Sequence, residues 1–223
     1  MFIVLFEVQP NSGKENAYLG YAKLLRPELE KVEGFVDNVR YRSLTREGWI
    51  LSLSSWVNEK ALVRWRTQAV HHEVQGKGRF EIFHDYHLRV GQVTRDTRLP
   101  EGCSLTEQRL DETEVGEGTA VTLIDSHVDH EWLKSANPED AAKTLGLDAQ
   151  ASGLAAWDVC EAVLTPGDVI LLLTWRDQKA AEAFEAAVSP GSGKRMRRVR
   201  VIRDYSLSDR REAPQYYPEV KRS

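Results

Sequence analysis

The stretch from Ile50 to Tyr86, ILSLSSWVNEKALVRWRTQAVHHEVQGKGRFEIFHDY, carries the pattern that decides the fold. Its first residues are apolar and β-favouring, which predicts a strand that ends at Trp56. Asn58 is a typical helix N-cap residue, and apolar residues at helical spacing follow it as far as Trp65. We therefore expect a strand and then a helix, with a break at the glycines at 76 and 78 and a second strand over residues 80–93.

The residues before this stretch show the same alternation of strands and helices. Residues 2–8 form a β-rich run in which Glu7 shares a side with Ile3 and Leu5, by the two-residue period of a strand. An apolar stripe at helical spacing covers residues 14–32, and Pro27 inside it predicts a kink or a split into two helices. Residues 35–43 and 49–56 are typical of a hairpin. The whole order is that of a ferredoxin-like unit.

A second copy of the pattern occupies residues 170–205 and reads ILLLTWRDQKAAEAFEAAVSPGSGKRMRRVRVIRDY. The matches keep one constant spacing and include Trp56 with Trp175, Trp65 with Phe184, and Tyr86 with Tyr205. The sequence therefore predicts an α+β fold in which two ferredoxin-like (βαββαβ) units of one chain pack sheet to sheet as a pseudo-dimeric α/β barrel. We assign residues 1–95 to the first unit, 96–118 to a linker, 119–210 to the second unit and 211–223 to a C-terminal tail.

The bulk composition argues against several classes of function. The 223 residues have a formal net charge of −4 and a pI near 5.9, whereas binding to nucleic acid needs a concentrated positive field. The two cysteines, Cys103 and Cys160, give no disulfide framework and lie in no CxxC motif. No apolar run reaches the roughly 20 residues of a membrane span, and the first residues lack the features of a signal peptide. We expect a cytoplasmic protein with no nucleic-acid or membrane partner.

Several motifs of the first unit occur together in the order of a known family. They are Gly34-Phe35, LSxSxW at 51–56, ALxxWR at 61–66, His71, and GRxxxFxDYxxRV at 78–90. Together they resemble the antibiotic biosynthesis monooxygenase (ABM) domain, and the second unit shares mainly the hydrophobic frame. The resemblance implies the dimeric α/β-barrel fold. The family includes cofactor-independent oxygenases of aromatic polyketides and quinols, heme-degrading monooxygenases, and proteins with no established activity.

The resemblance places the leading site candidates at Trp65 and His71. Trp65 stands in the family's pocket-lining tryptophan position, where an indole can stack on a flat substrate and donate its N–H to a substrate oxygen. His71 stands in the place of a polar pocket residue, and an imidazole that titrates near neutral pH can take a phenolic or enolic proton. Spacing alone leaves open whether His71 or His72 faces inward. The structural alternatives are a core tryptophan and a solvated histidine at a helix end.

Further candidates complete the predicted site. Arg66, Gln75 and Tyr86 are expected to bind substrate, and Glu7 is expected to be a pocket-facing acid that orients a histidine or a substrate hydroxyl. The alternatives are a solvated Arg66, a purely structural Tyr86, and Glu7 at an outer or an edge position. In the second copy, the two histidines fall opposite residues 190 and 191, Pro and Gly, and Arg66 falls opposite a glutamate. We therefore expect the site in the first unit.

Two departures from the family pattern bear on the cofactor. Quinone-forming members have an asparagine one turn before the pocket tryptophan, where this chain has Ala61. Heme-degrading members have an asparagine on the first strand and an axial histidine in the second helix, where this chain has Glu7 and Gln75. We therefore expect no cofactor, and heme is the less favoured alternative. The potential ligands from Asp125 to His130 are typical of a solvated turn, so no metal site is predicted.

The leading hypothesis is a cofactor-independent monooxygenase that uses O2 on a small phenolic or quinol-like aromatic compound in the first unit's pocket. The alternative is a non-catalytic, stress-associated or ligand-binding protein of the same fold, and a heme-degrading monooxygenase ranks below both. The chain forms its own internal pseudo-dimer, to which further homo-oligomerisation can add.

Overall fold

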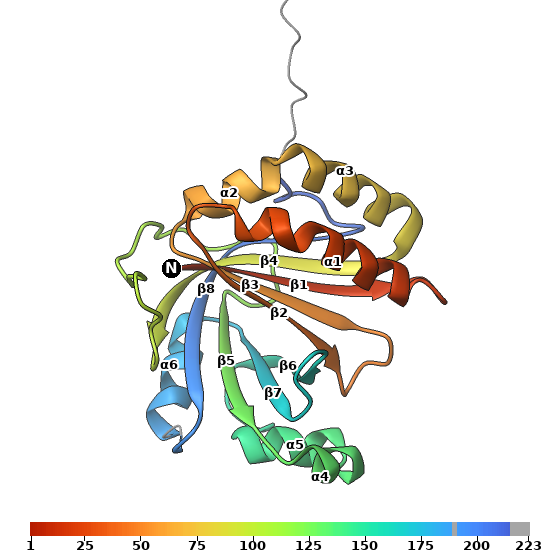
Figure 1. Ribbon diagram of the computed structural model, residues 1–223. Coiled ribbons are helices and arrows are strands. Elements are labelled where there is room, and N and C mark those ends of the chain that lie inside the picture. Colours follow the sequence, from red (N-terminus) through yellow and green to blue (C-terminus); the bar gives the residue numbers. More distant parts are fainter. Residues whose placement is uncertain (189–190, 215–223) are drawn as a thin grey trace, which may run out of the picture.

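The computed structural model describes residues 1–188 and 191–214, and the strands of this part of the chain close into one barrel (Figure 1). The first unit consists of β1 (Phe2–Pro10), α1 (Glu15–Glu30), β2 (Phe35–Ser43), β3 (Ile50–Trp56), α2 (Glu59–Thr67), α3 (Ala69–Lys77), the π-helical turn η1 (Gly78–Ile82) and β4 (Phe83–Asp96). The second unit consists of β5 (Ala120–His127), α4 (His130–Ser135), α5 (Pro138–Leu145), β6 (Leu154–Ala162), β7 (Asp168–Trp175), α6 (Gln178–Ala187) and β8 (Arg195–Ser206). Around the barrel the strands follow the order β1-β3-β2-β6-β7-β5-β8-β4. The predicted fold of two ferredoxin-like units in a pseudo-dimeric α/β barrel is confirmed.

Two seams join the units into this barrel. β2 pairs with β6 only from Tyr41–Ala162 to Ser43–Cys160, whereas β4 pairs with β8 along most of its length. In both seams the strands are antiparallel and are joined by backbone hydrogen bonds. Among the described strands, the closed order leaves none at the end of a sheet, but most of β2 and β6 lies outside their short pairing.

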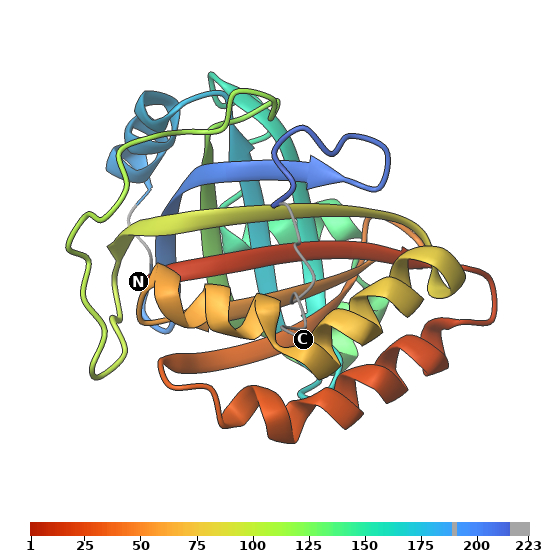
Figure 2. The same cartoon turned by 90° about the horizontal axis from the view of Figure 1, so that it is seen from above.

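The helices cover the outside of the barrel and leave its inside to side chains of the strands. α1, α2 and α3 lie against the first unit's sheet, and α4, α5 and α6 lie against the second (Figures 1 and 2). Along β1, Ile3 and Leu5 belong to the core inside the barrel, whereas Phe2 and Val8 belong to cores beneath the helices. Each strand face thus has its own environment, as the two-residue period requires.

The second unit packs its helices directly onto its sheet. Phe184 of α6 is buried against Trp175 of β7, with ring centroids 4.9 Å apart. Small and branched side chains, among them Ala142 and Leu145 of α5 and Val159 of β6, belong to the same buried cluster. This arrangement fills the space that corresponds to the region around Trp65 in the first unit.

The stretch from residue 50 to residue 86 differs in detail from the prediction. The predicted single helix divides at Gln68, whose backbone is extended (φ −63°, ψ 130°) and whose side chain accepts a hydrogen bond from the His71 amide. The predicted break at residues 76–78 was wrong, because α3 continues through Lys77 and passes into η1. β4 therefore begins at Phe83 instead of at residue 80, and Phe80 is 82% exposed.

Two other helix predictions have a clear outcome. Asn58 caps α2 by accepting a hydrogen bond from the Ala61 amide at 3.0 Å, as predicted. α1 continues through Pro27 as one helix and ends at Glu30, so the split that was one expected outcome does not occur.

The strand register confirms part of the alignment between the two copies. Trp56 lies opposite Phe2 across the β1–β3 pair, and Trp175 lies opposite Ala120 across the β5–β7 pair. Since these are the first residues of β1 and β5, the two tryptophans occupy equivalent positions. Both copies have tryptophan here because the position belongs to the core of each unit.

The predicted match of Tyr86 with Tyr205 was wrong. The first residues of β1 and β5 lie opposite Gln92 of β4 and Arg200 of β8, so these two residues are the structural counterparts. Among the described residues, α3 and η1 have no counterpart between α6 and β8, which changes the spacing of the copies after the helix. The two histidines therefore had no true partner in the second copy, and Pro190 itself lies outside the described residues.

Candidate functional site

A cavity of about 570 Å³ lies in the first unit between its helices and the outer face of its sheet, and we call it the helix–sheet cavity. Its walls are mainly apolar side chains of the strands and of the inward face of α1. They include Val4, Phe6, Ala22, Leu25, Leu29, Leu62, Ile82, Phe83, Leu88 and Val90. An apolar hollow of this size with a few polar groups is typical of sites for small ligands.

Trp65 and His71 stack on each other across the break between α2 and α3. Their ring centroids are 4.1 Å apart, the ring planes differ by 14°, and both side chains line the helix–sheet cavity. His71 Nδ1 lies 2.9 Å from the carbonyl oxygen of Trp65. Because a carbonyl oxygen only accepts, Nδ1 carries the proton and Nε2 keeps its lone pair. Burial lowers the pKa of His71 to about 4 despite this hydrogen bond, so the ring is neutral at pH 7.

The other predicted residues of the stretch border the same cavity. His72, Arg66 and Gln75 line it, and Gln75 Nε2 lies 3.4 Å from Nε2 of His71. Tyr86 is buried beneath them, and its hydroxyl accepts a hydrogen bond from Nη1 of Arg210. Both His71 and His72 line the cavity, so the question of which of them faces inward has the answer that both do.

Two lining residues that the sequence did not suggest as site residues come from the second unit. Tyr205 lies near the end of β8, and Arg210 lies in the segment that follows it. The β4–β8 seam brings them to the first unit, because Tyr205 lies opposite Leu88 of β4. The signal for this contact is tertiary, since the two strands are far apart in the chain.

Three buried polar atoms of the lining residues lack a hydrogen-bond partner within the described part of the chain. They are the Tyr18 hydroxyl, Oδ1 of Asn38 and Nε of Arg40. The Asn38 side-chain nitrogen donates to Ser52 Oγ and to the Leu53 carbonyl, each at 3.1 Å, which fixes the direction of the amide. An unsatisfied buried polar group costs about 1–3 kcal/mol. A ligand that bonded to any of the three atoms would recover part of this cost. The helical stripe marked Tyr18 only as a core residue.

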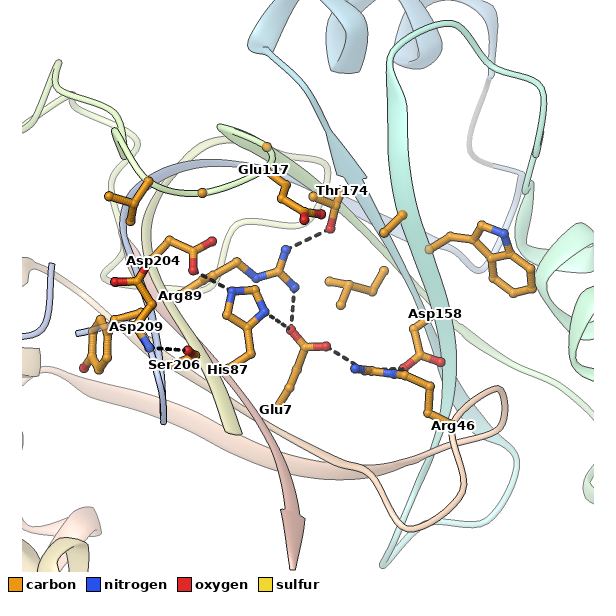
Figure 3. Close-up of a pocket in the computed structure, with 17 residues that line it drawn as sticks. Glu7, Arg46, His87, Arg89, Glu117, Asp158, Thr174, Asp204, Ser206 and Asp209 are labelled. Atoms are coloured by element: carbon orange, nitrogen blue, oxygen red, sulfur yellow. Dashed lines mark hydrogen bonds and ion pairs between the residues drawn. The ribbon is translucent and has the colours of Figure 1, made fainter. Parts of the chain in front are cut away.

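Glu7 does not line the helix–sheet cavity, so the expected pocket-facing acid is absent from the site of Trp65 and His71. It shares a side of β1 with Ile3 and Leu5, as the period predicted, and this side faces the inside of the barrel. The period gives the side of a strand, but it does not say which side the helices cover. Glu7 is 4% exposed and lines a second cavity, of about 410 Å³, that we call the barrel-end cavity (Figure 3).

A network of charged side chains surrounds Glu7 in the barrel-end cavity (Figure 3). Glu7 accepts hydrogen bonds from Arg46 and Arg89, each at 2.6 Å. His87 lies between Glu7, at 3.5 Å, and Asp204 of the second unit, at 2.6 Å. Burial alone would raise the pKa of Glu7, but Arg89, His87 and Arg46 hold it well below its ordinary value. Burial likewise opposes protonation of His87, but hydrogen bonds to the two carboxylates raise its pKa.

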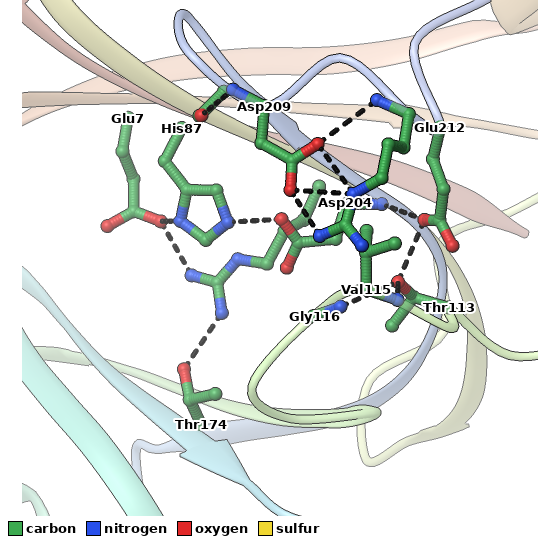
Figure 4. Close-up of polar contacts among 12 residues, drawn as sticks. Glu7, His87, Thr113, Val115, Gly116, Thr174, Asp204, Asp209 and Glu212 are labelled. Carbon is green, nitrogen blue, oxygen red and sulfur yellow. Dashed lines mark hydrogen bonds and ion pairs between the residues drawn. The ribbon is translucent and has the colours of Figure 1, made fainter.

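The same network joins the two units of the chain. Arg46 also pairs with Asp158 of β6 at 2.7 Å, and Arg89 donates to Thr174 of β7 at 2.8 Å. Figure 4 shows a neighbouring contact, in which Glu212 of the tail accepts hydrogen bonds from Thr113 of the linker and from the Asp204 amide of the second unit. The arginines, His87 and the carboxylates that they contact thus bond mainly to one another. We therefore regard this network as a connection between units, and the helix–sheet cavity as the candidate substrate site.

The turn with potential metal ligands is occupied by ion pairs. Asp125 pairs with Arg197 at 2.7 Å, and His130 pairs with Glu161 at 2.7 Å. Within residues 1–188 and 191–214, no three His, Cys, Asp or Glu side chains are grouped as ligands for a metal ion. None of the helices described there combines the length and the apolar character of a membrane span.

Comparison with known proteins identifies the family. Residues 1–77 match the ABM model, described as antibiotic biosynthesis monooxygenase. The chain is similar to a protein of Pyricularia oryzae named jasmonate monooxygenase ABM, with 46% identity over 223 residues that cover 98% of this chain and 99% of the relative.

Solved structures with a similar fold include aldoxime dehydratase, at 11% identity and a TM-score of 0.54, covering 96% of this chain and 88% of that one. A second is the aldoxime dehydratase OxdRE in complex with butyraldoxime, at 8% identity and a TM-score of 0.54, covering 93% and 80%. At these identities the two structures support the fold alone. The near full-length similarity to the Pyricularia oryzae relative, together with the match of the first 77 residues, shows that this chain belongs to the antibiotic biosynthesis monooxygenase family.

Proposed function

We propose that this protein is a monooxygenase that oxygenates a small, largely apolar molecule in the helix–sheet cavity. The observation that carries the proposal is the stacked pair of Trp65 and His71, in which a neutral imidazole keeps the lone pair of Nε2 at the cavity wall. Membership of the ABM family and the name of the Pyricularia oryzae relative support the reaction class.

In this proposal the two aromatic residues have different roles. Trp65 forms a wall on which the flat part of the substrate stacks, and His71 accepts a proton or a hydrogen bond from the group that becomes electron-rich. With the pKa of His71 at about 4, complete transfer of a phenolic proton to it costs about 8 kcal/mol. Positive side chains of the cavity offset part of this cost by stabilising the anion. Gln75 holds the imidazole ring in place, and His72 assists.

The substrate class determines where the electrons come from. Insertion of one oxygen atom into a C–H bond reduces the other atom of O2 to water, which takes two electrons and two protons. A hydroquinone supplies both itself when it becomes a hydroxyquinone. A jasmonate, which the relative's name suggests, needs a separate two-electron reductant such as a reduced nicotinamide nucleotide. The phenolic or quinol class and the jasmonate class therefore predict different requirements.

The test is oxygen uptake under ¹⁸O2, with a panel of hydroquinones alone and with jasmonic acid in the presence and absence of NADPH. We expect one ¹⁸O atom in the organic product and one in water. His71→Gln is expected to lower kcat/KM by about 10²–10⁴-fold, the usual contribution of a positioned acid or base. The matched control His84→Gln changes an exposed histidine of β4 and should leave kcat/KM unchanged.

Two other outcomes would change the conclusion. Ligand-induced stabilisation without oxygen uptake for every compound would contradict the proposal and favour a ligand-binding protein of the same fold. Full activity of His71→Gln would leave the monooxygenase assignment intact but show that His71 has no role in the reaction.

The proposal includes oxygenation without metal, flavin or heme. We expect activity to survive dialysis against a chelator and the protein to show no flavin absorption. Addition of hemin tests the heme alternative: a Soret band that His71→Ala abolishes would assign heme to Nε2 of His71, which is the unprotonated ring nitrogen.

A further inference from the structure

Arginine is the charged residue of the helix–sheet cavity. Among the described residues, the lining includes Arg40, Arg66, Arg79 and Arg210 but no aspartate or glutamate. None of these four arginines lies within ion-pair distance of a carboxylate in the part of the chain that the structure describes. The cavity is therefore positive as well as apolar.

This pattern departs from the rest of the barrel. Arg46 and Arg89 contact Glu7 at 2.6 Å, and Arg197 contacts Asp125 at 2.7 Å. The chain has more acidic than basic residues, 34 against 30, so partners are not scarce. A guanidinium beside an apolar wall keeps a strong field, because little water screens it, and its planar fork suits a carboxylate.

Two of the arginines share a neighbour, Tyr205, at one end of the cavity. Arg210 donates to the Tyr86 hydroxyl, and its guanidinium carbon lies 5.6 Å from the centre of the Tyr205 ring. Burial and Tyr86 raise the pKa of Tyr205 to about 12, while the positive charges of Arg66 and Arg210 act in the opposite direction. Arg66 of α2 and Arg210 of the second unit therefore line the same cavity as Tyr205, and the charges of both act on its hydroxyl.

We propose that this end of the cavity recognises a carboxylate, so that the substrate is a small monocarboxylic acid whose hydrocarbon body fills the apolar part. Arg66 and Arg210 bind the carboxylate, and Tyr86 and Tyr205 border it. The inference rests on the proposed function only where it calls the bound acid a substrate. Binding of the acid does not depend on turnover. It also gives the second unit a role in the first unit's site, since β8 and the segment after it deliver Arg210.

The test measures binding without turnover, by isothermal titration calorimetry under anaerobic conditions. The probes are two matched pairs of an acid and a neutral analogue, jasmonic acid with its methyl ester and octanoate with octanamide. We expect the acid of at least one pair to bind about tenfold or more tightly than its neutral analogue, because only the acid forms charge-assisted hydrogen bonds. Arg66→Gln and Arg210→Gln should each weaken binding of that acid about tenfold or more and change binding of the analogue little.

Matched variants separate recognition from general damage. Arg64→Gln removes an exposed arginine of α2 that pairs with Glu33, and it should leave both affinities unchanged. Arg210→Lys keeps the charge but loses the planar fork, and it should fall between wild type and Arg210→Gln. Circular dichroism and thermal unfolding verify that each variant is folded before it is titrated.

The outcomes distinguish this inference from the proposed function. Selective binding of an acid without oxygen uptake would sustain the carboxylate site and remove the monooxygenase proposal. Oxygenation of a neutral compound with equal binding of acid and analogue would do the reverse. The carboxylate site is overturned if no acid binds, if acid and analogue bind equally, or if the arginine variants weaken both probes to the same extent.

Discussion

His71 shows how burial decides the chemistry of a single residue. The sequence suggested an imidazole that titrates near neutral pH, but burial lowers its pKa to about 4. The hydrogen bond to the Trp65 carbonyl then fixes which nitrogen carries the proton. His71 is therefore a neutral acceptor throughout the physiological range, and it does not act as a switch between charge states.

Proton NMR of the ring protons tests this environment. The His71 signal, assigned by its loss in His71→Gln, should show no titration between pH 8 and pH 5.5, because the ring is neutral above its lowered pKa. A midpoint near 6.5 would contradict the burial of His71 in the folded protein.

At the scale of elements, the helix pair α2–α3 makes the difference between the two units. In the first unit the chain breaks at Gln68 and adds α3 and η1, which widens the space over the sheet. In the second unit α6 stands alone in the described region before β8, and Phe184 packs directly on Trp175. One extra helix thus accompanies a cavity, whereas its absence accompanies a filled core.

The turn that precedes β2 gives a stability prediction for these elements. Gly34 has a φ of +88°, and a Cβ there would lie 2.6 Å from Val57 Cγ2 and 2.8 Å from the Ala61 side chain. Gly13 has a similar φ of +75° but open space around it. We expect Gly13→Ala to lower the free energy of unfolding by about 1–2 kcal/mol through backbone strain. Gly34→Ala should cost about 1–3 kcal/mol more, because Val57 and α2 must also move.

Urea denaturation of both variants measures the cost of backbone strain, in Gly13→Ala, and the added cost of the contact with Val57 and α2, in Gly34→Ala. Equal losses in the two proteins would show that the contact between the turn and α2 adapts freely, which would contradict the close packing described here.

At the scale of the whole molecule, the buried network around Glu7 ties the units together. Arg89 is 3% exposed, so loss of its carboxylate partner would leave a charge without water or a counterion. His87 adds a pH-dependent contact, because it lies between Glu7 of the first unit and Asp204 of the second. Its pKa is raised in the folded protein, although the neighbouring Arg89 opposes the shift.

The sign of this contribution follows from the raised pKa. His87 stabilises the fold fully below its unfolded pKa of about 6.5, and the effect disappears as the pH rises through the folded value. The melting temperature of wild type should therefore exceed that of His87→Gln at pH 5.5, and the difference should shrink by pH 9. His84→Gln serves as the control on the same strand. A difference that grew with pH would contradict a raised pKa.

Predictions from the sequence succeeded where neighbouring residues determine the structure and failed where distant parts of the chain determine it. Local patterns placed the strand before Trp56 and the cap at Asn58 correctly, because neighbouring residues make those contacts. The match of Tyr86 with Tyr205 failed, because an inserted helix and turn interrupt the spacing of the copies. The six candidates between Trp65 and Tyr86 border one cavity, since a short stretch of chain carries them all.

By itself, the sequence determined the two ferredoxin-like frames and the side of β1 on which Glu7 stands. Periodicity encodes these features, because alternate residues of a strand and every third or fourth residue of a helix share a face. Only the tertiary structure decided which side of the sheet borders the cavity, and it moved Glu7 from the candidate site to the network between the units. It also brought Arg210 to the first unit's cavity, because barrel closure pairs β4 with β8, and no local pattern encodes which distant strands will meet.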